Sequence, residues 1–314
     1  MMRTTSGHFF IRTYNMAETL KKHQQSMTID EQIANLKAIG LQIDDEDYAR
    51  RILEDISYFR LIKAFSLNLK PRNGNYYKGV TFNQIVDLYL FNANFRQMLF
   101  PLIERIEINA RCRIANYISE HYGVLGYKEK ENFVSEEYHR QFLDDIKEEV
   151  RRNLRAPFVK NFMENYEGGE LPMYALVEIC SFGTLSKLYK NMKNPDKKAI
   201  AKSFGIGYTY YESWIESISY VRNICAHYGR IYNAKLAKKP ILYKQYIASG
   251  IDNNRIFAVL LCISHIVDHD GHWDKFLDDI ENLIAKYSNI DIDSMGFPKN
   301  WKELLKPQDN KHNG

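Results

Sequence analysis

The amino-acid sequence predicts an all-α protein, a helical bundle preceded by an N-terminal helical layer. Three observations support this fold class. Sixteen glycines and eight prolines in 314 residues are fewer than average usage, which favours long helices. Apolar residues recur at helical spacing along most of the chain. No alternating strand pattern of convincing length, no internal repeat and no low-complexity tract occurs.

The N-terminal layer is expected over residues 28–75, after a flexible arm at 1–27 that is polar and largely aperiodic. Thr28-Ile-Asp-Glu31 is a capping box that opens a helix, which Gly40 ends, and a second helix should begin after Asp44-Asp45. The stretch 52–69 is too dense in apolar side chains for a surface helix, so we expect it to be buried.

A helical bundle is expected over residues 76–290, followed by a tail at 291–314. Thr81-Phe-Asn-Gln84 is a second capping box, and the helix it opens should continue for nearly forty residues to Gly123, with Pro101 as a kink or break. Residues 124–171 predict one amphipathic helix and a polar connection that closes at Gly168-Gly169. Further helices are predicted at 172–192, 196–204, 208–228 and 253–288.

The composition indicates which cellular compartment and which kinds of site the protein is expected to have. The four cysteines stand far apart and form no C-x-x-C pair, so neither a zinc site nor a disulfide framework is indicated. No signal sequence or membrane-spanning run is present, and we expect a cytoplasmic protein without membrane contact. A net charge of +4 is compatible with a polyanionic partner but does not require one.

A polar cluster near residue 225 is the candidate site. Projected at about 100° per residue, residues 211–230 divide into a core face and a polar face that carries Asn223, His227 and Arg230, with Arg222 at its edge. An imidazole exchanges protons near neutral pH, and a guanidinium makes paired hydrogen bonds to phosphate. Because RNA carries its own nucleophile in the 2′-hydroxyl, these groups suit metal-free cleavage of RNA.

The same spacing has a plainer interpretation. Arg222 and His227 are also typical of the solvated face or the C-terminus of a helix, where cations complement the helix dipole. Spacing alone leaves both interpretations open.

The string Arg222-Asn223-Ile-Cys-Ala-His227 resembles the Arg-polar-x3-to-5-His signature of the HEPN superfamily of RNases. With its continuation to Asn233, it is similar to the AbiD/AbiF-like abortive-infection proteins within that superfamily. Other segments agree in order along about residues 28 to 235. They are Tyr58-Phe-Arg-Leu61, Asp87-Leu-Tyr-Leu-Phe91, Phe95-Arg96, Arg105-Ile-Glu107 with Arg111, and Pro172 through Gly183.

This resemblance implies a HEPN-like helical bundle that forms a homodimer, so that Arg222 and His227 of two copies line one RNA cleft. It implies a metal-independent endoribonuclease that leaves a 2′,3′-cyclic phosphate and serves phage defence or toxin-like growth arrest. Arg222, Asn223 and His227 would be catalytic, and Arg230 and Asn233 would bind RNA, with no cofactor or metal ion. Many relatives have a second histidine where this chain has Tyr228, which puts one proton donor or phosphate contact in doubt.

Three other groups of residues each have a functional and a structural interpretation. His265, His269 and His272 suggest a metal site, but Gly271 should interrupt their helix and leave a capped helix end. Glu107 and Arg111 are spaced as an intrahelical ion pair, and the alternative is that these two residues, with Arg105 and Arg113, face RNA. Three lysines beyond the motif form either an extended RNA track or a solvated loop: Lys235, Lys238 and Lys239.

Two alternatives to the nuclease stay open. The polar cluster could bind a structured RNA without cleaving it, or the chain could be a dimeric interaction module that binds no nucleic acid. Binding needs Arg222 but tolerates replacement of His227, whereas cleavage needs an imidazole. The sequence does not identify the RNA target, the trigger, or a regulatory RNA or protein inhibitor.

Overall fold

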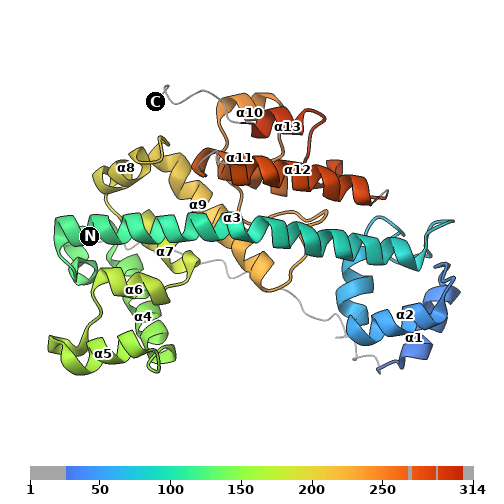
Figure 1. Cartoon of the computed structure of the whole chain (residues 1–314), viewed down its shortest axis with the longest axis horizontal. Helices are drawn as coiled ribbons and strands as arrows, with labels where there is room; N and C mark the ends of the chain where they lie inside the picture. The colour runs from blue at the N-terminus through green and yellow to red at the C-terminus, as the bar shows by residue number, and fades with distance from the viewer. Residues whose placement is uncertain (1–25, 268–270, 288, 307–314) are drawn as a thin grey trace, which may run out of the picture.

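Helices make up the architecture of the chain (Figure 1). The computed structural model describes residues 26–267, 271–287 and 289–306. Within these ranges the only extended pairings are three isolated bridges, such as that between Gln42 and Thr81. The prediction of an all-α protein is therefore confirmed.

The N-terminal layer contains α1 (Ile29–Ala38), α2 (Glu46–Asp55) and the short π-helix η1 (Phe59–Lys63). The predicted capping box is present: the hydroxyl of Thr28 accepts from the backbone of Glu31, whose carboxylate accepts from the backbone of Thr28. Burial of the apolar stretch 52–69 is confirmed for Leu61 and Ile62. It is wrong for Phe59, whose exposed fraction is 79%.

The central element is α3 (Phe82–Tyr122), which spans the molecule in Figure 1. Its 41 residues correspond to a length of about 60 Å at 1.5 Å per residue. The capping box of Thr81 and Gln84 opens it as predicted, and it ends at Gly123, where φ is 82°. Pro101 lies inside the helix and does not break it. Because α3 contacts η1, α6, α7, α9 and α12, it aligns segments that are far apart in sequence.

Four helices lie near the C-terminal end of α3: α4 (Glu136–Arg152), α5 (Pro157–Asn165), α6 (Met173–Ile179) and α7 (Phe182–Asn191). The single helix predicted over 172–192 is in fact two helices. Cys180 and Ser181 have extended backbones, and the hydroxyl of Ser181 accepts from the backbone N–H of Thr184 at 3.0 Å. This serine starts a new helix, and neither of the two extended residues is a proline or a glycine, although Gly183 follows in the first turn of α7.

The chain continues through α8 (Asn194–Lys202), α9 (Tyr208–Ala226), α10 (Lys244–Ala248), α11 (Ile256–Ile266), α12 (Gly271–Lys286) and α13 (Trp301–Leu305). Figure 1 shows α10 to α13 on the side of α3 opposite α4 to α6. The segment expected as a tail contains η5 (Asp293–Met295) and α13 up to residue 306. Trp301 and Leu305 are buried, and the indole of Trp273 donates to the carbonyl of Leu305 at 2.9 Å. Residues 1–25 of the expected arm lie outside the described residues.

Candidate functional site

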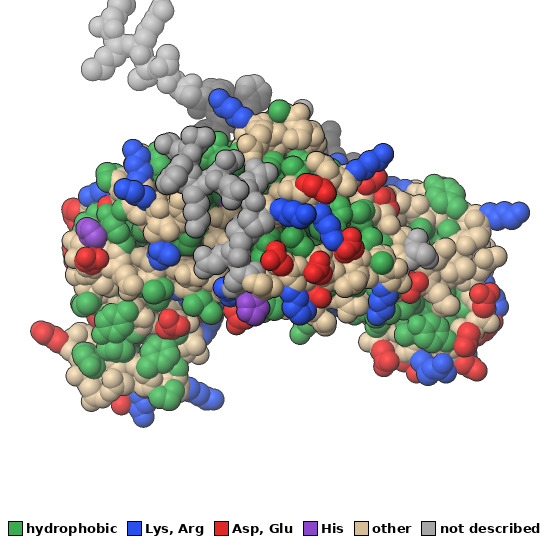
Figure 2. Space-filling model, turned by 45° about the horizontal axis from the view of Figure 1, so that its top comes forward, with side chains coloured by type: hydrophobic (Ala, Val, Ile, Leu, Met, Phe, Trp, Pro, Cys, Tyr) green, Lys and Arg blue, Asp and Glu red, His purple; other side chains and the backbone are tan. Residues whose placement is uncertain are grey.

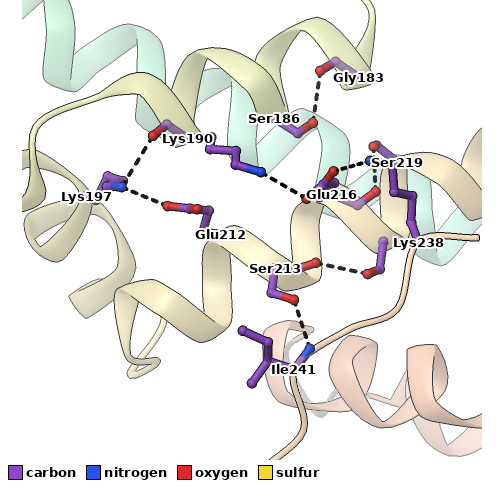
Figure 3. A network of polar contacts seen from close by, with 11 residues as sticks. Gly183, Ser186, Lys190, Lys197, Glu212, Ser213, Glu216, Ser219, Lys238 and Ile241 are labelled. Carbon is purple, nitrogen blue, oxygen red and sulfur yellow. Dashed lines mark hydrogen bonds and ion pairs between the residues drawn. The ribbon is translucent and has the colours of Figure 1, made fainter. Parts of the chain in front are cut away.

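The first half of α9 is anchored by ion pairs to its neighbours (Figure 3). Lys197 of α8 contacts Glu212 at 2.7 Å, and Glu216 contacts both Lys190 of α7, at 3.6 Å, and Lys238, at 2.6 Å. The apolar face of α9 is buried as the helical projection predicts, including Trp214. Lys238, one of the three lysines considered for an RNA track, therefore already forms an ion pair with Glu216.

Arg222 is held in place by a buried carboxylate on α3. Its Nε donates to Oε2 of Glu107 at 3.0 Å, and the Arg222 side chain keeps an exposed fraction of 32%. Its guanidinium carbon also lies 5.9 Å from the ring centre of Phe100. Among the described residues no hydrogen bond engages Nη1 or Nη2 of Arg222. The carboxylate therefore fixes the Nε side of the guanidinium, and the two terminal nitrogens make no hydrogen bond to the described residues.

Glu107 joins three helices. Besides Arg222 of α9, it contacts Arg111 one turn along α3, which confirms the predicted intrahelical pair. Arg111 in turn donates to the carbonyl of Val177 in α6. A buried carboxylate shared by two guanidinium groups has its charge well compensated, so this cluster is a rigid base for Arg222.

His227 lies at the end of α9, because the helix stops at Ala226. Its backbone N–H donates to the carbonyl of Asn223 at 3.0 Å, and its φ and ψ of −98° and 19° are no longer helical. The His227 side chain is exposed, and no hydrogen bond to its imidazole occurs within the described residues. The side chain of Asn223 is also exposed. One helix thus presents a fixed guanidinium and an exposed imidazole.

The turn after His227 is a Schellman motif. The N–H of Gly229 donates to the carbonyl of Ile224 at 2.7 Å, and that of Tyr228 donates to the carbonyl of Cys225 at 3.3 Å. Tyr228 occupies the left-handed position of the motif, with φ of 58°, where glycine is usual. A side chain at Gly229 would place its Cβ 2.8 Å from Cγ2 of Ile224. The motif requires glycine at 229 and strains the tyrosine at 228.

Three side chains from distant elements hold this turn. Nη1 of Arg60, in η1, donates to the carbonyl of Tyr228 at 3.2 Å. Nη1 of Arg96, in α3, donates to the carbonyl of Cys225 at 3.3 Å. The amide of Asn92 accepts from the backbone N–H groups of residues 231 and 232 at 2.7 and 3.0 Å. These contacts fix the chain on both sides of His227.

The family model for the Abi-like proteins matches residues 51–233, more than half of the chain. The chain belongs to the Abi-like protein family. Membership associates it with abortive infection, the form of phage defence after which the family is named. No curated protein and no solved structure matches the chain.

The region matched to the Abi-like family contains every side chain described above for Arg222, His227 and the turn. Sequence reasoning did not assign a role to Asn92, nor to Arg60 or Arg96, although both arginines lie in segments that carry the resemblance. For Glu107 it considered an ion pair with Arg111 or a position facing RNA, but not a contact with Arg222. The missing information was tertiary, because these contacts join η1 and α3 to the end of α9.

The placement of Arg230 on the polar face of the helix is wrong, because α9 ends four residues earlier. Arg230 lies in the following loop, where its Nη1 donates to the carbonyls of Tyr232 and Asn233 at 3.0 and 3.3 Å. Burial, aided by Arg255, lowers the pKa of Arg230. The amide oxygen of Asn233 accepts from Arg255 at 3.2 Å. Both predicted RNA-binding side chains therefore also brace the loop of this Abi-like chain.

Of the three histidines considered for a metal site, His265 and His272 are described by the structure. Nε2 of His265 is 2.9 Å from the hydroxyl of Tyr246, and His269 lies outside the described residues. Among the residues that are described, no group of three His, Cys, Asp or Glu side chains is placed to hold a metal ion. In the same residues, no helix combines the length and apolar character needed to cross a membrane.

Proposed function

We propose that this Abi-like protein is a HEPN-type endoribonuclease that acts in phage defence and cleaves RNA without a metal ion. The observation that carries the proposal is the pair of side chains at the C-terminal end of α9, one held in place and the other exposed. Glu107 fixes Arg222 with its terminal nitrogens open, whereas His227 stands exposed at the helix end. A fixed cation and an exposed imidazole are the groups that phosphodiester cleavage by an internal hydroxyl needs.

In the proposed reaction, the imidazole of His227 takes the proton of the RNA 2′-hydroxyl. The 2′-oxygen then forms a bond to phosphorus, and the bond between phosphorus and the 5′-oxygen breaks. A protonated imidazole returns a proton to the leaving 5′-oxygen, while Arg222 donates to the phosphoryl oxygens that gain charge. The products are a 2′,3′-cyclic phosphate and a 5′-hydroxyl, so atoms and protons balance.

A second copy of the chain is part of the proposal. One His227 can act as the base, but the leaving oxygen lies on the opposite side of phosphorus in an in-line displacement. We therefore place the two protomers of a homodimer with their α9 ends facing one RNA strand. Activity would be restrained by a regulatory RNA or a protein inhibitor until infection.

RNA binding without cleavage is the second candidate. It is favoured by the cationic surroundings of the turn, where Arg60 and Arg96 have no carboxylate partner within the described residues. Figure 2 shows that acidic and basic side chains are interspersed over one large face of the molecule. Any RNA contact through these arginines would thus be local rather than spread over that whole surface.

The test is incubation of the purified protein with total cellular RNA and with tRNA in excess EDTA. We expect the wild-type protein to cleave, and His227→Ala and Arg222→Ala to lose activity while keeping the helical circular dichroism of the wild type. His121→Ala is the matched control, because His121 is likewise exposed in the last turn of a helix. Unchanged cleavage by His227→Ala would refute the nuclease, and retained RNA without cleavage would favour the binding protein.

A further inference from the structure

Tyr228 adopts a backbone conformation that its side chain disfavours. It fills the left-handed position of the Schellman motif at the end of α9, with φ of 58°. A glycine there would avoid the clash between Cβ and the backbone. A strained backbone conformation persists only where the surrounding contacts hold it in place, and such residues concentrate at functional sites. The identity of residue 228 is therefore not explained by the turn itself.

The Tyr228 ring points to the solvent beside two guanidinium groups. Its exposed fraction is 68%, the largest among the tyrosines of the described residues. The ring centre lies 5.9 Å from the guanidinium carbon of Arg60 and 5.7 Å from that of Arg96. These cations hold the aromatic side chain in one place while most of its surface stays open.

Arg96 is a buried cation without a carboxylate. Its exposed fraction is 7%, and its Nε is buried with no hydrogen-bond partner. No ion pair to Arg60 or Arg96 occurs within the described ranges, and burial, together with the nearby charge of Arg60, lowers the pKa of Arg96. Two neighbouring positive charges that lack a counter-ion are stabilised when an anion binds beside them.

We propose that Tyr228, Arg60 and Arg96 form a nucleotide subsite in which an RNA base stacks on the Tyr228 ring and the adjoining phosphate accepts hydrogen bonds from Arg60. Arg96 supplies positive charge behind the ring. Because residue 228 follows His227 directly, this nucleotide lies next to the bond that is cleaved. The subsite deepens the function proposed above and rests on it for the nature of the ligand.

The ligand class follows from the chemistry of the three side chains. An aromatic ring can stack on any base, and a guanidinium can donate hydrogen bonds to any phosphate, so neither group selects a sequence. Bases are accessible for stacking only where RNA is unpaired. The subsite therefore fits single-stranded RNA or a loop.

The test measures binding of a fluorescein-labelled, single-stranded RNA 12-mer of mixed sequence by anisotropy. His227→Ala is the parent variant, so that the RNA stays intact. Tyr228→Gly removes the ring and relieves the backbone strain, and we expect Kd to rise about tenfold, as for the loss of one stacked base. Its melting temperature should equal or exceed that of the parent, because relief of the left-handed strain offsets the lost ring contacts.

Two variants serve as controls. Tyr228→Phe keeps the stacking ring and should bind within about twofold of the parent. Tyr138→Ala removes another exposed tyrosine, on α4, and should leave Kd unchanged. In addition, Arg60→Gln should reduce the slope of log Kd against log salt by about 0.7, the value for one phosphate contact on a single strand.

The outcomes separate the subsite from the nuclease. A Kd within about twofold for Tyr228→Gly, or no measurable binding by the parent at low salt, overturns the subsite whether or not the wild-type protein cleaves RNA. If the wild-type protein cleaves nothing but Tyr228→Gly still weakens binding tenfold, the subsite stands and the nuclease does not. A lower melting temperature with unchanged Kd would assign Tyr228 a purely structural role.

Discussion

Glu107 accepts a hydrogen bond from Nε of Arg222 at 3.0 Å, across 115 residues of sequence. The contact joins the middle of α3 to the last turns of α9, and Arg111 reinforces it from one turn along α3. The guanidinium on which the proposed chemistry depends is thus positioned by a side chain outside the Arg-x4-His motif.

Removal of Glu107 should destabilise the fold. Glu107→Ala leaves the largely buried Arg111 without its carboxylate, which should cost about 3 kcal/mol of unfolding free energy. A double-mutant cycle with Arg222→Ala, measured by urea denaturation, should give a coupling energy of about 1 kcal/mol, because Arg222 is partly exposed. The exposed pair Lys147–Asp144 is the control and should show about 0.3 kcal/mol. Equal coupling in both pairs would contradict a positioning role for Glu107.

Gly229→Ala should lower the unfolding free energy by about 1–3 kcal/mol. The new Cβ would lie 2.8 Å from Cγ2 and 3.2 Å from the carbonyl oxygen of Ile224, so the turn after His227 must shift. Gly183→Ala is the comparison, since its Cβ would meet only the hydroxyl of Ser181 at 3.6 Å. It lies in the first turn of α7 and should be neutral or slightly stabilising. Urea denaturation of both variants checks the difference, and equal losses would argue against a tight turn at 229.

Cys225 should be chemically inert, although it lies within the motif between Arg222 and His227. Burial raises the pKa of the Cys225 thiol to about 12, so almost no thiolate forms near neutral pH. Cys180 and Cys262 are buried as well, and Cys112 alone of the four is exposed. A thiol-reactive disulfide reagent should therefore modify one cysteine rapidly in the native protein, and none in Cys112→Ser. Rapid labelling of Cys225 would contradict the structure of the turn.

The stability of the fold should fall in alkaline solution between about pH 10 and 12. Burial, and then the hydrogen bonds to the Asp196 carboxylate, raise the pKa of both Tyr117 and Tyr122 from 10.0 to about 12. The unfolded chain then loses these protons at lower pH than the folded chain. The stabilisation of the fold by the two protonated tyrosines is therefore complete below about pH 10 and is lost as the pH rises towards about 12. Urea midpoints across the window should decline less steeply for Asp196→Asn. An identical decline would show that Asp196 does not hold these protons.

Local sequence signals predicted the starts of helices well. The capping boxes at Thr28 and Thr81 reach only three residues along the chain, and both are present. Interruptions were less predictable. Pro101 is accommodated within α3, whereas α6 and α7 are separated at Cys180 and Ser181, neither of which is a proline or a glycine. The 3.6-residue period assigns a side chain to a face only while the helix lasts, which is why Arg230 was misplaced.

The candidate site was predictable in its chemistry but not in its supports. Arg222 and His227 belong to a short local pattern that the family resemblance makes visible. Their supports, Glu107 and Arg96, come from α3, more than a hundred residues earlier. No periodicity relates residues that meet only through tertiary packing, so their roles required the structure.

The central claim, that the RNA 2′-hydroxyl is the nucleophile, is tested most directly by mapping the ends of RNA cleaved in excess EDTA. We predict 2′,3′-cyclic phosphate and 5′-hydroxyl ends, and no cleavage of the same RNA when its riboses are 2′-O-methylated. Products with 5′-phosphate and 3′-hydroxyl ends, or cleavage of the methylated strand, would contradict the account.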